Sequence, residues 1–243
     1  MLRVDTLSVT VDQKTILHSV SLRIELGKVH VIMGPNGSGK STLAHVLMGY
    51  PAYTITNGQI WFNGTDITHS MPDVRACAGI FLAVQNPYSI PGVRISSLLK
   101  EASRALRPSS FCLQQFLQEI QDYCTLLSID RAVLERSINE GFSGGEKKKL
   151  EILQMLVCKP SLVILDEIDS GLDIDALALI GKAISYARQQ NSALSILVIT
   201  HYQRILQYLI PDMVHIMSRG HIIDSGDLAL VHTIEQRGYH EYQ

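Results

Sequence analysis

A glycine-rich segment, residues 34–42, constrains this chain more than any other part of its sequence. It reads GPNGSGKST and fits the pattern G-x-x-x-x-G-K-[ST] at every fixed position. Glycines let the backbone curl tightly, so that successive N–H groups point inward at phosphate oxygens. The apolar run Val29–Met33 predicts a buried strand before the segment, and Ser41–Met48 predicts a helix after it. Because the helix dipole adds positive potential at the same point, the segment predicts a phosphate-binding cradle.

The residues of this cradle have different expected roles. We expect nine of them to contact nucleotide: Gly34, Pro35, Asn36, Gly37, Ser38, Gly39, Lys40, Ser41 and Thr42. Lys40 would reach the β- and γ-phosphates of ATP, and the Ser41 hydroxyl would ligate Mg²⁺. A chance glycine turn before a helix is the other interpretation, but the strand and the helix both stand where the pattern requires them. The segment alone leaves open which class of nucleotide-binding protein owns it.

An acidic pair follows a second apolar run. Leu162–Leu165 is followed by Asp166 and Glu167, and a buried strand here would carry both carboxylates to its C-terminal end, where open α/β sheets bind ligands. Asp166 would then hold Mg²⁺, directly or through water, and Glu167 would accept a proton from an attacking water. Without the cradle upstream, a helix-capping acid pair would be the better interpretation. With the cradle, the catalytic interpretation is favoured.

Two further strands are expected to end at the same edge. Gln85 follows the predicted strand Ile80–Val84, and His201 follows the predicted strand Leu194–Thr200. His201 could donate a hydrogen bond to the γ-phosphate or to the attacking water, and Gln85 is expected to contact nucleotide and Mg²⁺. A single histidine or glutamine at a strand end is usually structural. The hypothesis therefore depends on four chain segments bringing these side chains and Lys40 together.

The rest of the pattern predicts one α/β domain, residues 1–243. Residues 2–10 and 20–25 alternate apolar and polar, as half-buried strands do, and Asn63-Gly64 signals a hairpin. Apolar residues recur at helical spacing between about 87 and 145, which indicates an inserted helical subdomain. Strands and helices alternate after Gly145, which indicates a mostly parallel sheet covered on both faces. We expect a nucleotide-binding core of residues 1–86 and 146–243, with an N-terminal antiparallel β subdomain.

Charge and composition limit the kinds of partner and environment expected for this chain. The formal net charge is −2, and the longest basic run, Lys147–Lys149, is expected to be a solvated helix face; neither feature is typical of a nucleic-acid binder. The apolar runs are far shorter than the roughly 20 residues that cross a bilayer. We therefore expect a cytoplasmic protein with no direct membrane insertion. The four cysteines, without metal-site spacing, are expected to be reduced thiols in or near the core.

A second glycine pair precedes a predicted helix. Phe142–Glu146 reads FSGGE, and Ser143, Gly144 and Gly145 at a helix N-terminus would form another phosphate-facing surface. This surface makes sense if two copies of the chain meet head-to-tail, so that ATP is held between the cradle of one copy and the FSGGE segment of the other. The segment lies about twenty residues before Asp166, which is the order of motifs in ABC-type ATPases.

The chain resembles the ABC-type ATPases, and within them the SufC family, the ATPases of the SUF iron–sulfur cluster assembly system. The residues that carry the resemblance are FSGGEKKKLEILQM at 142–155, LDEIDSGLDIDAL at 165–177, FLAVQNPYSIPGV at 81–93 and THYQRIL at 200–206. The resemblance implies the ABC-ATPase fold, Asp173 in the loop that contacts the partner copy, Mg²⁺-dependent ATP hydrolysis, a transient ATP-dependent homodimer and a SufB–SufD scaffold as partner. Many ABC ATPases stack adenine on an aromatic near the position of Val11; here no aromatic precedes Tyr50, so loose base discrimination is expected.

Three alternatives stay open. The chain could be the nucleotide-binding subunit of a transporter, although such subunits usually carry Pro-Thr where this chain has Ile168-Asp169. It could be a DNA-associated ABC ATPase, although those carry a long coiled coil or DNA-binding domains. It could also hold ATP without cleaving it, which the acidic pair and His201 disfavour.

Overall fold

The computed structural model describes residues 1–201 and 204–239, and only the backbone of residues 235–237. Its strands are β1 Leu2–Val11, β2 Lys14–Ile24, β3 Val29–Met33, β4 Thr54–Phe62, β5 Thr65–Asp66, β6 Ile80–Ala83, β7 Ile90–Arg94, β8 Ser137–Ile138, β9 Leu162–Asp166, β10 Ser195–Ile199, β11 Met213–Ser218 and β12 His221–Gly226. Its helices are α1 Lys40–Met48, α2 Pro72–Cys77, α3 Ile95–Leu106, α4 Leu113–Leu126, α5 Gly144–Cys158, α6 Ile174–Gln190 and α7 Leu228–Arg237, with 3₁₀ turns at Arg131–Glu135 and Arg204–Gln207.

A six-stranded sheet forms the centre of the molecule. Its order is β12-β11-β3-β10-β9-β6, and all neighbours run parallel except the β11–β12 hairpin. The strands β3, β9 and β10 are buried along their whole length, because both faces of the sheet are covered. Since parallel strands end at the same edge, the segments that follow β3, β6, β9 and β10 lie together.

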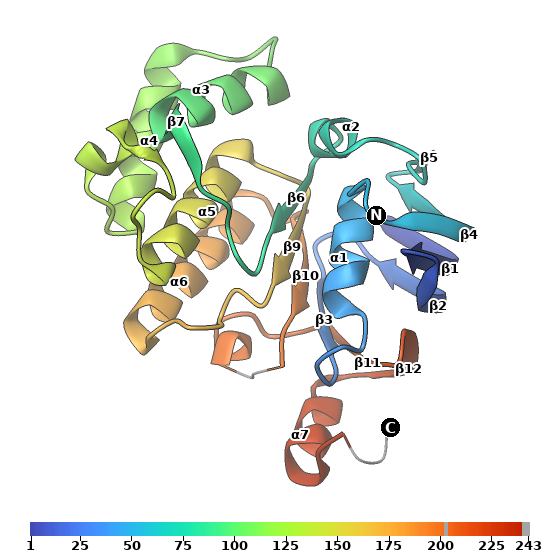
Figure 1. Ribbon diagram of the computed structural model, residues 1–243. Coiled ribbons are helices and arrows are strands. Elements are labelled where there is room, and N and C mark those ends of the chain that lie inside the picture. The colour runs from blue at the N-terminus through green and yellow to red at the C-terminus, as the bar shows by residue number, and fades with distance from the viewer. Residues whose placement is uncertain (202–203, 240–243) are drawn as a thin grey trace.

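The two faces of this sheet belong to different cores. Ile32 packs on one side with α1 and the N-terminal strands, whereas Val31 packs on the other side with α5 and α6. Figure 1 shows α3 and α4 as a separate group beyond α5 and α6, on the opposite side of the molecule from β1, β2 and β4. The alternation of side chains along a strand therefore assigns neighbouring residues of β3 to separate hydrophobic cores.

The N-terminal strands form a second sheet that is tied to the glycine-rich segment. The order of this antiparallel sheet is β2-β1-β4-β5. The His18 N–H donates to the Gly220 carbonyl at 2.9 Å, and the Gly220 N–H donates to the Ser38 carbonyl at 2.9 Å. A Cβ on Gly220 would lie 2.1 Å from the Ile16 carbonyl oxygen, and φ of Gly220 is +79°. Glycine is required here because β2, the β11–β12 hairpin and the segment approach so closely.

The α/β fold predicted from the sequence is confirmed, including its parallel core and the Asn63-Gly64 hairpin between β4 and β5. The pattern does not predict α2, α7 or the β7–β8 pair. The β7–β8 pair joins Ile90 to Ile138, a contact between distant segments that local periodicity cannot show. For α7 a signal exists, because Val231 and Ile234 share one buried face at helical spacing.

The cysteines lie only partly where the sequence places them. The prediction that they lie in or near the core is wrong for Cys77 and Cys112, which are exposed, and correct for Cys124. The exposed pair lies at the ends of short or amphipathic elements, where the sequence pattern does not distinguish a thiol that faces water. Residues 202–203 of the THYQRIL segment lie outside the described residues.

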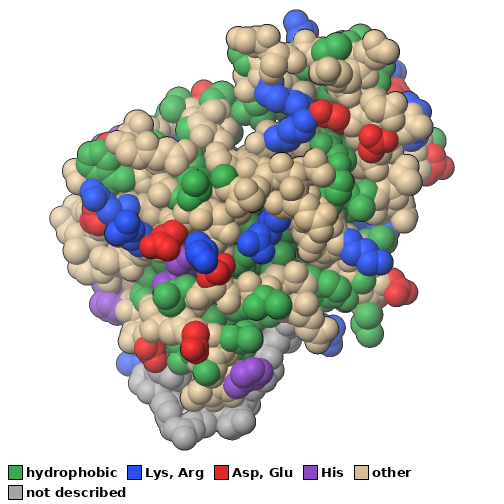
Figure 2. All heavy atoms as spheres, turned by 180° about the vertical axis from the view of Figure 1, so that it is seen from behind, with side chains coloured by type: hydrophobic (Ala, Val, Ile, Leu, Met, Phe, Trp, Pro, Cys, Tyr) green, Lys and Arg blue, Asp and Glu red, His purple; other side chains and the backbone are tan. Residues whose placement is uncertain are grey.

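The charged surface and the helices concern two further expectations, that the chain binds no nucleic acid and does not insert into a membrane. On the face in Figure 2, acidic and basic side chains of the described residues lie in small mixed groups. Among the residues that the structure describes, none of the helices combines the length and apolar character that crossing a bilayer requires. The expectation that the chain binds no nucleic acid stays a prediction.

A buried arginine anchors the far end of α1. Arg75 is 1% exposed, and its guanidinium donates to four backbone carbonyls. Two of these acceptors, Val46 O and Leu47 O, belong to the last turn of α1, at 2.9 and 3.0 Å. The guanidinium therefore adds donors at the C-terminal carbonyls of α1, of which Val46 O also accepts the Gly49 N–H at 3.0 Å, and places positive charge at the negative end of the helix dipole. Burial lowers the pKa of Arg75 to about 10, which still leaves it charged at neutral pH.

We expect Arg75→Leu to lower the free energy of unfolding by roughly 3 kcal/mol, because it leaves buried carbonyls without donors. Urea denaturation measures the change. Arg104→Leu is the matched control, since the Arg104 guanidinium is exposed and pairs with exposed Glu101; its effect should stay within about 0.5 kcal/mol. Equal effects of the two substitutions would contradict this account.

Candidate nucleotide site

A pocket of about 560 Å³ lies over the carboxyl edge of the central sheet. Its lining residues are Ile16, Asn36, Gly37, Gly39, Lys40, Ser41, Thr42, Gln85, Glu167, Ser170 and His201. Four segments far apart in the sequence therefore bring the predicted side chains to one place. Gly34 and Ser38 are buried beneath the pocket, and Pro35 is half-buried beside them.

The glycine-rich segment forms a cradle at the start of α1. Gly39 has φ +104° and precedes Lys40, and no described side chain caps the first turn of α1. The N–H groups of that turn therefore remain available to an anion, where the helix dipole also favours negative charge. Lys40 is 4% exposed, and its ammonium donates to the Gly34 and Pro35 carbonyls at 2.9 and 3.0 Å. Burial lowers the pKa of Lys40, while Glu167 and Asp166 oppose the shift.

Ser41 and Asp166 form a group of oxygen atoms beside the cradle. The Ser41 hydroxyl donates to Asp166 Oδ1 at 3.1 Å. Asp166 is 1% exposed, and its other oxygen, Oδ2, is buried and accepts no hydrogen bond from the residues that the structure describes. Burial raises the pKa of Asp166 to about 6, although the Ser41 hydrogen bond opposes the shift. A buried carboxylate oxygen without a donor, next to a hydroxyl, fits a small divalent cation that prefers oxygen ligands.

Glu167 lies between Gln85 and His201. The Gln85 amide donates to Glu167 Oε2 at 2.5 Å, and His201 Nδ1 lies 3.4 Å from Glu167 Oε1. Glu167 has φ +47°, a conformation that costs energy in a residue with a side chain. Its N–H donates to the Ile199 carbonyl at 2.8 Å, which holds the residue in place. The carboxylate is thus fixed at the pocket wall by groups from β6, β9 and β10.

The end of β10 is fixed by a buried carboxylate. The Thr200 hydroxyl lies 2.9 and 3.1 Å from the two carboxylate oxygens of Asp169, and both residues are buried. Burial raises the pKa of Asp169, and the Thr200 hydrogen bond opposes the shift. Because His201 follows Thr200 directly, this contact helps to determine where the histidine enters the pocket.

The FSGGE segment lies outside this pocket. Ser143 and Gly144 are exposed, Gly145 is half-exposed, and none of them lines the cavity. Ser143 caps α5: its hydroxyl accepts the Glu146 N–H at 3.3 Å, and the Glu146 carboxylate accepts the Ser143 N–H at 2.8 Å. Asp173 caps α6 by accepting the Ala176 N–H at 2.7 Å and is also absent from the pocket lining. The structure of one chain does not bring these residues to the cradle.

Sequence reasoning missed several residues near the site. Ile16 and Ser170 line the pocket; Ser170 could have been found from its place three residues after Glu167, but Ile16 reaches the pocket only through the packing of β2. The prediction that residues 147–149 form a solvated face is wrong for Lys148, which is 4% exposed. Its ammonium lies 3.6 Å from Glu151, three residues along the same helix, and donates to the Val84 carbonyl. A local charge pattern cannot identify the second of these partners, which is distant in the sequence.

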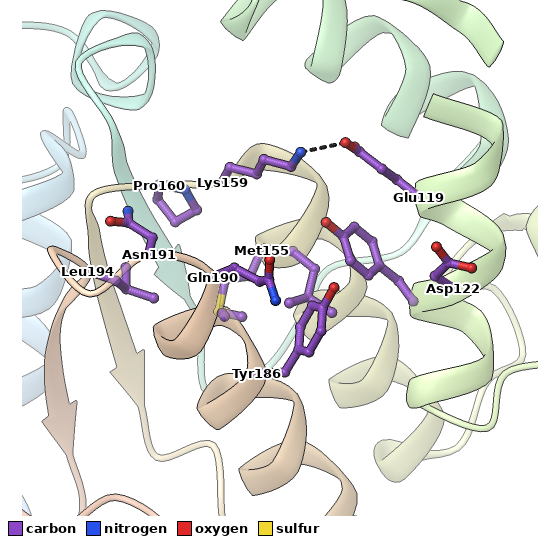
Figure 3. A pocket seen from close by; sticks show the side chains of 12 residues that line it. Glu119, Asp122, Met155, Lys159, Pro160, Tyr186, Gln190, Asn191 and Leu194 are labelled. Carbon is purple, nitrogen blue, oxygen red and sulfur yellow. Dashed lines mark hydrogen bonds and ion pairs between the residues drawn. The ribbon is translucent and has the colours of Figure 1, made fainter. Parts of the chain in front are cut away.

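Another cavity, of about 400 Å³, lies between α4 and the ends of α5 and α6 (Figure 3). Tyr186 and Met155 face into it, and an ion pair between Lys159 and Glu119 crosses beside it. None of the predicted site residues lines this cavity. The pocket at the sheet edge, where backbone N–H groups, a lysine and carboxylates converge, is therefore the candidate nucleotide site.

Comparison with known proteins agrees with this geometry. The family model described as ABC transporter matches residues 17–170. The chain is 48% identical to the probable ATP-dependent transporter ycf16 of Pyropia yezoensis, over 98% of this chain and 96% of that protein. It is 47% identical to the probable ATP-dependent transporter slr0075 of Synechocystis sp., over 98% of this chain and 94% of that protein.

Among solved structures, the dimeric bacterial ABC transporter cassette MJ0796 superposes with a TM-score of 0.80 at 17% identity, covering 94% of this chain and 99% of that one. This likeness concerns the fold. The family of the chain follows from the family match and the relatives, and the cradle and the acidic pair agree with it. It belongs to the ABC transporter family, as one of its ATP-hydrolysing ATP-binding cassettes.

Proposed function

We propose that this chain is the cytoplasmic ATPase subunit of a SUF-type iron–sulfur cluster assembly system and works as an ATP-dependent head-to-tail homodimer. The main support for the dimer is that the two expected phosphate-binding surfaces lie apart in a single chain. The cradle lies in the pocket, whereas Ser143 and Gly144 are exposed at the start of α5. A second copy would place its Ser143 segment over the γ-phosphate held by the first, with Asp173 near the contact. The cassette MJ0796, which shares this fold and is dimeric in its solved structure, supports the arrangement.

In the proposed reaction, water attacks the γ-phosphate in line with the leaving oxygen, and Glu167 accepts the proton of the water. Gln85 and His201 hold the carboxylate where the pocket exposes it. Lys40 leaves its two carbonyl acceptors to stabilise charge on the β- and γ-phosphates, and the Ser143 segment of the other copy does the same from the opposite side. The free chain therefore hydrolyses slowly, because half of each site comes from the other copy.

The residues present fit Mg²⁺. Ser41 and Asp166 would hold the ion, with Gln85 as a further ligand, and Mg²⁺ would neutralise charge that develops on the phosphates. Asp166 has a buried oxygen to which no described residue donates, and such an ion would satisfy it. The domain division into a core of residues 1–86 and 146–243 and a helical subdomain of residues 87–145 is part of the same proposal.

The SUF assignment is supported by residues that depart from the transporter pattern. Ile168 and Asp169 stand where transporter ATPases usually carry Pro-Thr, and both are buried, with Asp169 bonded to Thr200. The proposed partner is a SufB–SufD-type scaffold that is reshaped when two ATPase subunits close. The second candidate is the nucleotide-binding subunit of a transporter, because the relatives carry the name of probable ATP-dependent transporters.

Two substitutions test whether each ATP site is composed of the cradle of one copy and the Ser143 segment of the other. We expect Glu167→Gln to reduce hydrolysis by about 10² to 10⁴, the usual contribution of a general base, and to keep the ATP-bound dimer. In that background, Ser143→Asp should abolish the dimer, because its carboxylate would face the triphosphate of the other copy. Size-exclusion chromatography with ATP measures the dimer, and phosphate release measures hydrolysis.

Ser143→Asn is the matched control. Asparagine and aspartate both cap helices well, so the melting temperatures of both variants should lie close to that of the wild type. Only the charged one should lose the dimer. If Ser143→Asp in the Glu167→Gln background still forms the dimer with ATP, or if Glu167→Gln alone keeps full turnover, the proposed site between two copies is wrong.

The pKa of Asp166 gives a pH-dependent prediction. Its folded pKa, about 6, exceeds the ordinary 3.8, so the contribution of Asp166 to stability is fully present below about pH 4 and is lost as the pH rises through 6. Asp166→Asn removes this loss and should stabilise the nucleotide-free protein by about 3 kcal/mol at pH 7.5. The gain should vanish near pH 4, and Mg²⁺-dependent hydrolysis should be lost. Urea melts at both pH values measure the stability; an equal gain at both would contradict the burial argument.

Co-purification separates the two candidate functions. The tagged chain, isolated from its native source and cross-linked, should recover two related proteins without membrane spans, which would be the scaffold. Recovery of a protein with several membrane spans instead would favour the transporter. A cross-linker that acts through exposed lysines gives both kinds of partner the same chance.

A further inference from the structure

Val84 directly follows β6, an edge strand of the central sheet. The ladder between β6 and β9 runs from the Ile80–Leu162 pair to the Ala83–Leu165 pair and stops there. Beyond it, Val84 needs other partners for its backbone N–H and C=O, because such groups are almost always paired when they leave water. Side chains supply them. Glu151 Oε1 accepts the Val84 N–H at 2.7 Å, and the Lys148 ammonium donates to the Val84 carbonyl at 2.5 Å.

Both side chains come from α5 and are buried. Lys148 is 4% and Glu151 6% exposed, and Lys148 Nζ lies 3.6 Å from Glu151 Oε2. Burial raises the pKa of Glu151 to about 7 and lowers that of Lys148, and each group opposes the shift of the other. A buried ion pair is weak support for stability, since desolvation offsets its attraction. Here the Glu151 carboxylate also bonds the N–H of Val84, and the Lys148 ammonium bonds its carbonyl. The pair therefore determines where Val84 lies.

The position of Val84 determines the position of Gln85. Gln85 is the next residue, lines the nucleotide pocket and donates its amide to Glu167 at 2.5 Å. A displacement of Val84 would therefore move the group that orients the proposed general base. The same helix α5 begins at the Ser143 cap, so the residues that hold Val84 are joined rigidly to the surface expected to meet the other copy's ATP.

We propose that Glu151, together with Lys148, is a positioning residue for hydrolysis: it holds the backbone of Val84 so that Gln85 orients Glu167. Glu151 touches neither the nucleotide pocket nor Glu167 in this role. The inference rests on the proposed function of Glu167 as the base. It assigns to the buried carboxylate a task in the reaction rather than in stability alone.

Three substitutions at Glu151 separate geometry from charge. Glu151→Gln keeps an acceptor oxygen at the same reach, Glu151→Asp keeps the charge but withdraws the oxygen by one methylene, and Glu151→Leu removes the acceptor. In Glu151→Leu the Val84 amide should exchange hydrogen at least tenfold faster. The kcat for ATP should fall at least tenfold, because small misplacements of reacting groups are costly. KM should stay within about twofold, because the cradle is untouched.

Glu151→Gln is the matched control, and its amide exchange and kcat should stay within about threefold of wild type. If Glu151→Leu does not fold, as judged by its melting transition, Glu151→Asp replaces it, with the same direction of change expected. Amide exchange by NMR and steady-state phosphate release with Mg·ATP are the two readouts.

The inference is overturned if Glu151→Leu, or Glu151→Asp in its place, keeps wild-type kcat, or if kcat and ATP affinity fall together with loss of the fold in both. Glu167→Gln, measured in parallel, distinguishes failure of the proposed base from failure of the role proposed for Glu151. If Glu167→Gln keeps full turnover, the proposed base is wrong. If Glu167→Gln is inactive while the acceptor-deficient Glu151 variants turn over normally, only the role of Glu151 is wrong.

Discussion

The site depends on a backbone loop whose polar groups are already bound to the rest of the fold before any phosphate arrives. The Ser38 carbonyl accepts from Gly220, and the carbonyls of Gly34 and Pro35 accept from Lys40. The N–H groups at the start of α1 then remain for an anion. The cradle is therefore held in its anion-binding shape by contacts from β2, the β11–β12 hairpin and its own lysine.

The parallel sheet positions the acidic, amide and imidazole side chains beside the cradle. Asp166 ends β9, Gln85 follows β6 and His201 follows β10, so each comes to the same edge at its own register position. Hydrophobic packing on both faces makes that edge rigid. The costs of the site are also visible: a buried Asp166 with a raised pKa and a strained Glu167 backbone. Local strain and uncompensated charge of this kind are typical of sites where ligands bind.

Helix α5 connects the two surfaces that ATP would join. Its first turn presents Ser143 outward, and its second and third turns hold Val84 through Lys148 and Glu151. One element thus combines an exposed helix cap, which we propose faces phosphate, with a buried contact beside the candidate nucleotide pocket. This arrangement gives a physical meaning to the lysine run, which a charge count alone assigns to solvent.

The sequence by itself determined the cradle, the acidic pair and the alternation of strands and helices, because each is a local pattern in which neighbouring residues act together. Burial of the strands and the hairpin turn at Asn63-Gly64 followed for the same reason. Only the tertiary structure decided that Ile16 reaches the pocket, that Gln85 bonds Glu167, that Arg75 anchors α1 and that Lys148 is buried. These contacts join residues far apart in the chain, and no local periodicity records which distant backbone group a side chain will meet.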